Sequence, residues 1–216
     1  VDIVIPAVDA YLSSLVAESP LLKQVAIEGV ELELPIIDSA VGRLLETLVL
    51  VTGAQRVLEI GTANGCSALW LARALPHNGR LISIELDPTR ARIARGHFDD
   101  AGIGNRANVM VGDAARLVHK VSGPFDVIFN DGDKRQYLQL LDRLVTLLRP
   151  GGVLVTDNVL WNGEVVPGLV TPPLRPTDET EAIARYNKQL AADSRLVTSF
   201  LPVRDGVSVS VRKCSS

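Results

Sequence analysis

The chain has 216 residues, of which 47% are hydrophobic, and this length suits one α/β domain with a sizeable core. A formal net charge of -3 excludes a whole-chain basic field for nucleic acid or an anionic membrane surface. Aromatic residues make up only 4%, which disfavours platforms for stacking bases. We expect a single domain over 1–216, with N-terminal helices over 1–52 and the main core over 53–216.

Apolar residues near the N-terminus recur at helical spacing. The pattern predicts amphipathic helices over 8–19 and 38–52, because their apolar side chains fall on one face. Pro20 and Pro35 lie in the stretch between them, for which we expect a less regular connection.

From residue 56 onward, short apolar strands alternate with helices. We predict strands at 56–61, 80–85, 107–112, 125–131 and 152–158, and helices at 66–75, 88–100, 134–148 and 178–192. A loop over 160–177 precedes the last helix, and a closing hairpin follows it, with strands 196–203 and 206–212. This alternation predicts an α/β fold with a Rossmann-like, mostly parallel sheet, to which the hairpin adds one antiparallel strand.

The first two strands end in residues suited to a nucleoside. Gly61 and Gly65 permit a tight turn and close approach of a ligand to the backbone, although the spacing is not that of a dinucleotide fingerprint. Glu59 and Glu85 are acidic, and a carboxylate at the second strand end can accept hydrogen bonds from both ribose hydroxyls. The pattern favours a nucleoside without phosphates, and the alternative is an ordinary turn beside a solvated strand end.

Acidic residues also follow the later strands. Asp113 either caps the next helix or, with Ala114, borders a base. Asp131 and Asp133 follow the fourth strand and Asp157-Asn158 follow the fifth. Such like charges are costly to bring together without a cation, and their oxygen ligands suit Mg²⁺, Mn²⁺ or Ca²⁺.

Several polar or aromatic residues near these strand ends allow two interpretations. Lys134 is either a general base beside a metal or an ion-pair partner of Asp131 or Asp133. Trp161 and Asn162 either line an acceptor pocket under a lid formed by the 160–177 loop or, for Trp161, anchor the packing.

The remaining titratable residues suggest no second site. We expect surface or capping positions for His77, His97 and His119. Cys66 and Cys214 allow one disulfide, but no basic-then-apolar leader opens the sequence and no apolar run reaches the roughly 20 residues of a membrane span. We therefore expect a reducing, cytoplasmic setting.

Five motifs then occur in order: VLEIGTANGCSALWLA, ISIELDP, NDGDKRQY, VTDNVLWNG and LPVRDGVSVS. Over about residues 36 to 213 they resemble the cation-dependent O-methyltransferases, the family that includes caffeoyl-CoA and catechol O-methyltransferases, and in particular its small bacterial members. The resemblance implies a class I methyltransferase fold with a seven-stranded sheet. It also implies S-adenosylmethionine as methyl donor, a divalent cation, a homodimer and a small catechol-like acceptor.

The resemblance also implies residue roles. The positions that match cofactor contacts are Ile37, Glu59, Gly61, Thr62, Ser67, Glu85, Ala114 and Asp133. The metal ligands match Asp131, Asp157 and Asn158, the acceptor contacts match Asp131 and Asn162, and the general base matches Lys134. Three other functions stay open at this point: an O-methyltransferase that modifies tRNA, an NAD-dependent dehydrogenase, and a non-catalytic binding protein.

Overall fold

The protein is described here from a computed structural model, which covers residues 3–214. Seven strands form one sheet in the order β3-β2-β1-β4-β5-β7-β6. All neighbouring strands are parallel except β7, which runs antiparallel to both β5 and β6, and this confirms the predicted single antiparallel strand. The strands are β1 (Arg56–Ile60), β2 (Arg80–Glu85), β3 (Ala107–Val111), β4 (Phe125–Asn130), β5 (Leu148–Thr156), β6 (Leu196–Leu201) and β7 (Val207–Arg212).

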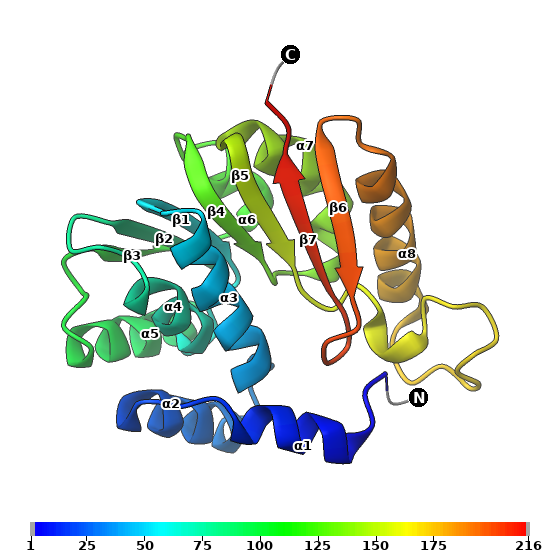
Figure 1. The fold of residues 1–216 in the computed structure, drawn as a ribbon, viewed down its shortest axis with the longest axis horizontal. Coiled ribbons are helices and arrows are strands. Elements are labelled where there is room, and N and C mark those ends of the chain that lie inside the picture. The colour runs from blue at the N-terminus through cyan, green and yellow to red at the C-terminus, as the bar shows by residue number, and fades with distance from the viewer. Residues whose placement is uncertain (1–2, 215–216) are drawn as a thin grey trace.

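Helices cover both faces of the sheet, and each face has its own apolar core (Figure 1). One core joins the sheet to α3 (Ser39–Val51), α4 (Cys66–Arg73) and α5 (Pro88–Asp100). The other joins it to α6 (Ala114–Leu117), α7 (Tyr137–Leu147) and α8 (Thr177–Ala192). Near-continuous apolar strands are explained by this arrangement, because both faces of each central strand are buried.

The strand order reverses between β1 and β4, where chain connections leave the sheet in opposite directions. In such sheets the ends of the strands at the reversal leave a crevice between the loops. Asp87 and Asp113 each cap the helix that follows their strand, since their carboxylates accept backbone N–H groups at the start of α5 and α6. This confirms the capping interpretation of Asp113, and Asp87 has the same role at α5.

The N-terminal segment differs from the prediction. Helix α1 (Pro6–Ser14) ends earlier than expected, and residues predicted as an irregular connection form a second helix, α2 (Pro20–Glu31). Pro20 does not break this helix because it occupies the first turn, where its missing N–H costs nothing, and the Ser19 hydroxyl accepts the N–H of Leu22. In Figure 1, α1 and α2 lie across the end of the molecule toward which the parallel strands point.

Smaller differences concern the region around β5. Residues 134–136 form a 3₁₀ turn, η1 (Lys134–Gln136), ahead of α7. Strand β5 begins at Leu148 rather than at 152, because the Pro150-Gly151-Gly152 segment bulges outward where β5 pairs with β4. The 160–177 loop contains a short 3₁₀ turn, η2 (Trp161–Gly163).

Both cysteines are free thiols, with Cys66 buried and Cys214 exposed, so no disulfide joins them. Within residues 3–214 no helix combines the length and apolar character needed to cross a membrane.

Candidate active site

A cleft of about 510 Å³ opens at the carboxyl ends of β1, β2, β4 and β5. It brings together most of the residues predicted for the site from sequence. Those that line it are Ile37, Gly61, Thr62, Ser67, Glu85, Ala114, Asp131, Asp133, Lys134 and Asn158. Glu59, Asp157 and Asn162 are not among the lining residues.

The turn after β1 forms one wall of the cleft. Gly61 has a φ of 85°, and a Cβ at this position would lie only 2.5 Å from the carbonyl oxygen of Asp131. Any residue larger than glycine would therefore push the β1 and β4 loops apart. This close approach sets the cleft wall formed by Thr62 beside the acidic residues that follow β4.

Glu59 lies beneath this wall rather than on it, with its side chain fully buried. Its carboxylate accepts hydrogen bonds from the hydroxyls of Ser67 at 2.6 Å, Ser83 at 2.5 Å and Thr62 at 2.9 Å. Burial raises the pKa of Glu59 to about 7 despite these donors. Glu59 thus orients two side chains of the cleft wall, Thr62 and Ser67, from below.

Glu85 forms the opposite edge of the turn. One carboxylate oxygen accepts the backbone N–H groups of Thr62 at 3.0 Å and Ala63 at 2.9 Å. The other oxygen accepts the N–H of Asp87 at 2.9 Å. The carboxylate is held rigidly at the cleft, and Oε1, which accepts only one N–H group, keeps lone-pair capacity for a ligand hydroxyl.

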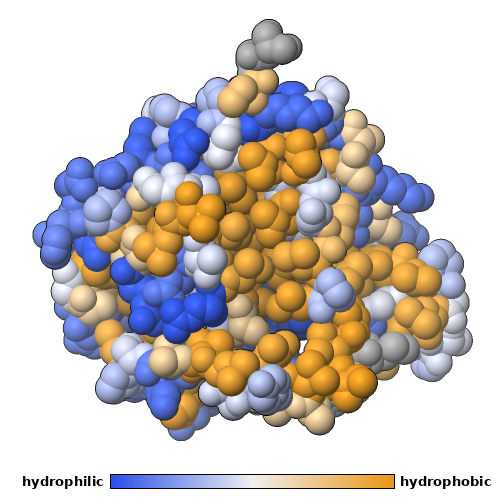
Figure 2. Space-filling view, viewed as in Figure 1, coloured by the Kyte–Doolittle hydropathy of each residue, from blue (hydrophilic) through white to orange (hydrophobic). Residues whose placement is uncertain are grey.

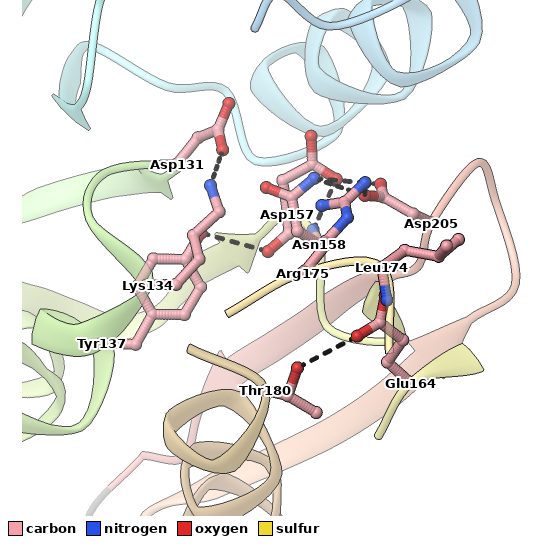
Figure 3. Close-up of polar contacts among 10 residues, drawn as sticks. All are labelled: Asp131, Lys134, Tyr137, Asp157, Asn158, Glu164, Leu174, Arg175, Thr180 and Asp205. Carbon is pink, nitrogen blue, oxygen red and sulfur yellow. Dashed lines mark hydrogen bonds and ion pairs between the residues drawn. The ribbon is translucent and has the colours of Figure 1, made fainter. Parts of the chain in front are cut away.

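Asp131 and Lys134 form a partly buried ion pair at the other end of the cleft, with 2.7 Å between Nζ and Oδ1 (Figure 3). Lys134 Nζ also lies 5.4 Å from the ring centre of Tyr137. Lys134 is therefore an ion-pair partner of Asp131 in this structure. Asp133, the other predicted partner, pairs with Arg135 instead.

Asp157 and Asn158 follow β5 next to this pair. Asp157 is fully buried; its Oδ1 accepts the N–H of Asn158 at 2.8 Å, while its Oδ2 has no hydrogen-bond partner. Burial and then the charges of Asp131 and Asp205 raise the pKa of Asp157 to about 8. A buried carboxylate oxygen without a donor is costly, so this arrangement fits a positively charged ligand.

The donor chemistry agrees with this interpretation. Asn158 donates its side-chain N–H groups to both oxygens of Asp205 at 3.0 and 2.9 Å, which leaves the amide oxygen as the atom available to a ligand. Two carboxylates and an amide oxygen suit Mg²⁺, Mn²⁺ or Ca²⁺. Within residues 3–214 no cluster contains three or more His, Cys, Asp or Glu side chains with the geometry of a metal site.

Asp205 also lines the cleft, although it lies in the predicted hairpin turn and no role in the site was predicted for it. It is buried, and its backbone oxygen accepts the N–H groups of Leu160 and Trp161, both at 2.9 Å. Its position follows from the antiparallel pairing of β7 with β5, which returns the hairpin turn to the strand end that carries Asp157. The sequence predicted the hairpin that contains Asp205, but it did not predict that β7 pairs with β5.

The loop after β5 covers the end of the cleft that carries Asp131 and Lys134. The guanidinium carbon of Arg175 lies 3.9 Å from the ring centre of Trp161, and both residues line the cleft. Glu164 accepts hydrogen bonds from Leu174 N at 3.3 Å and Thr180 Oγ1 at 3.4 Å, which joins the loop to α8 (Figure 3). Asn162 adopts a left-handed conformation with φ 52° and lies outside the cleft wall.

Comparisons with known proteins agree with this fold and site. A family model described as O-methyltransferase matches residues 12–213. Catechol O-methyltransferases from Niastella koreensis and Mycobacterium tuberculosis are 35% and 36% identical to the chain, over 80% and 83% of it and 80% of each relative. The crystal structure of an O-methyltransferase from Bacillus cereus in complex with SAH superposes with a TM-score of 0.85 at 32% identity, covering 96% of this chain and 97% of that one.

The seven-stranded sheet, with its C-terminal antiparallel hairpin, is that of the class I methyltransferases. The chain belongs to the O-methyltransferase family, and it is an S-adenosylmethionine-dependent O-methyltransferase. The chain is therefore neither a dehydrogenase nor a non-catalytic binding protein.

Proposed function

We propose that this enzyme transfers a methyl group from S-adenosylmethionine to one hydroxyl of a catechol-like acceptor, with a divalent cation held by Asp131, Asp157 and Asn158. The observation that carries the proposal is the buried, unpaired Oδ2 of Asp157 beside a second carboxylate, at one end of a cleft large enough for two small ligands. The two catechol O-methyltransferases among the relatives support the choice of acceptor.

The cofactor would occupy the end of the cleft beside β1 and β2. Glu85 faces this end with a carboxylate fixed by three backbone N–H groups, and its Oε1, which accepts only one of them, would accept a ribose hydroxyl. Ser67 would contact the carboxylate of the methionine moiety, and Ala114 would contact the base. The other proposed contacts are Ile37, Gly61, Thr62 and Asp133, while Glu59 contributes by holding Thr62 and Ser67 in place.

The acceptor would occupy the end beside β4 and β5, under the loop that carries Trp161 and Arg175. A bound cation, Mg²⁺ before Mn²⁺ or Ca²⁺, would supply Lewis acidity that favours ionisation of the acceptor hydroxyl near neutral pH. Lys134, after its ammonium has released a proton to solvent, would receive the hydroxyl proton at Nζ, and Asp131 orients that nitrogen. Asn162 would contact the acceptor only after the loop rearranges, because it lies outside the cleft wall in this structure.

Rate enhancement would come mainly from alignment of the acceptor oxygen with the sulfonium methyl, since the donor is already activated. The rigid turn at Gly61 and the fixed carboxylate of Glu85 position the donor from one side. The side chains of Lys134 and Trp161 would limit the position of the acceptor from the other side of the cleft.

The test is a radiolabelled methyl-transfer screen with catechols, hydroxycinnamoyl thioesters, flavonoids and bulk tRNA, each with Mg²⁺ and with excess chelator. We expect transfer to catechols that the chelator abolishes and Mg²⁺ restores, while calorimetry shows unchanged binding of S-adenosylhomocysteine. Full catechol methylation after exhaustive chelation would reject the cation role, and transfer only to tRNA would reject the acceptor class.

We also propose that the enzyme is a cytoplasmic homodimer. Both cysteines are free thiols, which suits a reducing compartment. Apolar side chains gather on the face of the molecule seen in Figure 2, over α3 and the β5–β7 region, and a second copy of the chain would cover them.

A further inference from the structure

His97 makes two polar contacts that the function described so far does not use. It was expected at the surface or as a cap, but it is buried on α5, with only 7% of its surface exposed. Its Nδ1 lies 2.8 Å from the backbone oxygen of Asn64, and its Nε2 lies 2.7 Å from Oε2 of Glu28 on α2. The other two histidines, His77 and His119, are exposed as expected.

Both ring nitrogens have an oxygen partner. A carbonyl oxygen carries no hydrogen, so Nδ1 must donate to Asn64, while Nε2 lies within hydrogen-bond distance of the Glu28 carboxylate. His97 therefore joins two separate elements, helix α2 and the turn after β1, through two polar contacts.

Asn64 belongs to the turn that forms the cofactor wall of the cleft. Its side chain is fully buried and donates from Nδ2 to the backbone oxygen of Val25 on α2 at 2.7 Å. The turn contains a non-glycine residue in the left-handed region, Ala63 with φ 48°, a conformation that persists only when its surroundings hold it. Glu85 holds the turn from the cleft side, while His97 and α2 hold it from behind.

Helix α2 connects this back support to a second part of the cofactor wall. A Cβ on Gly29 would lie 2.8 Å from Ile36 and 3.2 Å from Asn64 Nδ2, so glycine lets the helix, the turn and the following segment meet closely. The segment after α2 carries Ile36 and Ile37, which line the cleft. Movement of α2 away from α5 would therefore displace two walls of the cofactor end together.

We propose that His97 is a positioning residue, whose contacts with Glu28 and with the carbonyl of Asn64 lock α2 onto the cofactor turn and keep the cofactor end of the cleft preformed. The proposal rests on the proposed location of S-adenosylmethionine at that end. If the lock is broken, only a fraction of molecules has the binding-competent arrangement, and the apparent cofactor affinity falls by that fraction. Chemistry in molecules that have bound the cofactor is unaffected, because neither His97 nor Glu28 touches the cleft.

The test compares Glu28→Gln, His97→Gln and the double variant with Glu31→Gln and His119→Gln, which change the same residue types at exposed positions. We expect each lock variant to weaken binding of S-adenosylhomocysteine about fivefold to tenfold, the effect of one lost charge-assisted hydrogen bond. The KM for S-adenosylmethionine should rise in parallel, with kcat at saturating cofactor within about twofold of the parent enzyme.

Because both side chains act through one contact, the double variant should be no weaker than the worse single variant. In ¹⁵N spectra of the histidine rings, the His97 signals should move in Glu28→Gln, which alters the partner of Nε2, and stay in place in Glu31→Gln. The Glu28→Gln arm also decides the question if His97→Gln fails to fold.

Unchanged cofactor affinity in Glu28→Gln, additive losses in the double variant, or a fall in kcat with unchanged KM would each overturn the proposal. A parent enzyme that fails to bind S-adenosylhomocysteine would instead reject the proposed function, and the ring spectrum would still report whether the lock exists.

Discussion

Two carboxylates near the cleft are fully buried, but in different surroundings. Glu59 accepts three hydroxyl donors, whereas Asp157 keeps one oxygen without any partner. A satisfied carboxylate supports its neighbours, while an unsatisfied one beside a like charge is costly in the absence of a cation. Glu59 is therefore expected to affect the pH dependence of stability, and Asp157 to affect binding of a cation.

We predict that Asp157→Asn abolishes function without destabilising the metal-free protein. Catechol methylation should fall at least about 100-fold, the scale on which metal sites respond to loss of a ligand or its support. The free energy of unfolding in chelator should stay within about 1 kcal/mol of the parent or rise, because the variant removes a buried charge that has no donor. Urea unfolding and a methyl-transfer assay measure the two effects, and Asp142→Asn, at an exposed position on α7, is the control. Normal transfer by Asp157→Asn would remove this residue from the ligand set.

The pH dependence of stability should report the burial of Glu59. Its pKa rises from 4.5 to about 7 on folding, so between these pH values the folded state binds more protons than the unfolded state. The free energy of unfolding therefore falls as pH rises through this window, by about 3 kcal/mol in total from this residue. Glu59→Gln should lose that part of the slope in urea titrations from pH 4.5 to 8, while the exposed control Glu181→Gln retains it. Parallel slopes for Glu59→Gln and the parent would show that Glu59 titrates normally.

Helices α3 and α4 pack more closely than side chains on both would allow. A Cβ on Gly42 would overlap the indole of Trp70, which is buried between α3 and α4 with Arg43 and Arg73 over its faces. A second helical glycine, Gly96 on α5, is exposed and has open space around it. Replacement of glycine by alanine should thus change the free energy of unfolding in opposite directions at these two positions.

We predict that Gly42→Ala lowers the free energy of unfolding by about 2 kcal/mol, because the added methyl must displace a packed indole. Gly96→Ala should raise it by about 0.5–1 kcal/mol, the gain from replacing glycine in an open helix position. Urea unfolding of both variants decides the matter. Equal effects at the two sites would mean that α3 and α4 are not held at this distance.

One face of the whole molecule is apolar and uncovered. Helix α3 crosses part of this face in Figure 1, but β6 and β7 are open beside it. Val197 and Val211 are direct cross-strand neighbours there and are 60% and 38% exposed, while Val51 at the end of α3 is 78% exposed. Removing such side chains from water favours association.

We therefore predict a dimer in sedimentation and light-scattering experiments, which Val51→Asp combined with Val197→Asp should convert to a monomer, because charges cannot be buried unpaired at an interface. Val166→Asp, at an exposed position in the loop after β5, should leave the dimer intact. A parent protein that stays monomeric at all concentrations would contradict the prediction, as would a dimer that tolerates both charges.

The sequence by itself determined the order of strands and helices from β1 onward, because apolar periodicity and turn residues act over a few neighbouring positions. Most of the site residues that it predicted line the cleft, since parallel strands place their carboxyl ends at one edge of a sheet. Asp131 and Asn158 are examples, and the roles proposed for them rest on that placement.

Only the tertiary structure decided which of these residues lie on the cleft surface and which lie beneath it. Three contacts join residues that are distant in the chain. They are the hydrogen bond of Ser83 to Glu59, that of Asn158 to Asp205, and the contact of His97 with Glu28. Local sequence patterns carry no information on such partners. The start of α2 at residue 20 has a local signal in the Ser19 cap and in Pro20 at the first helical position. Its packing against the cofactor turn was decided only by the tertiary structure.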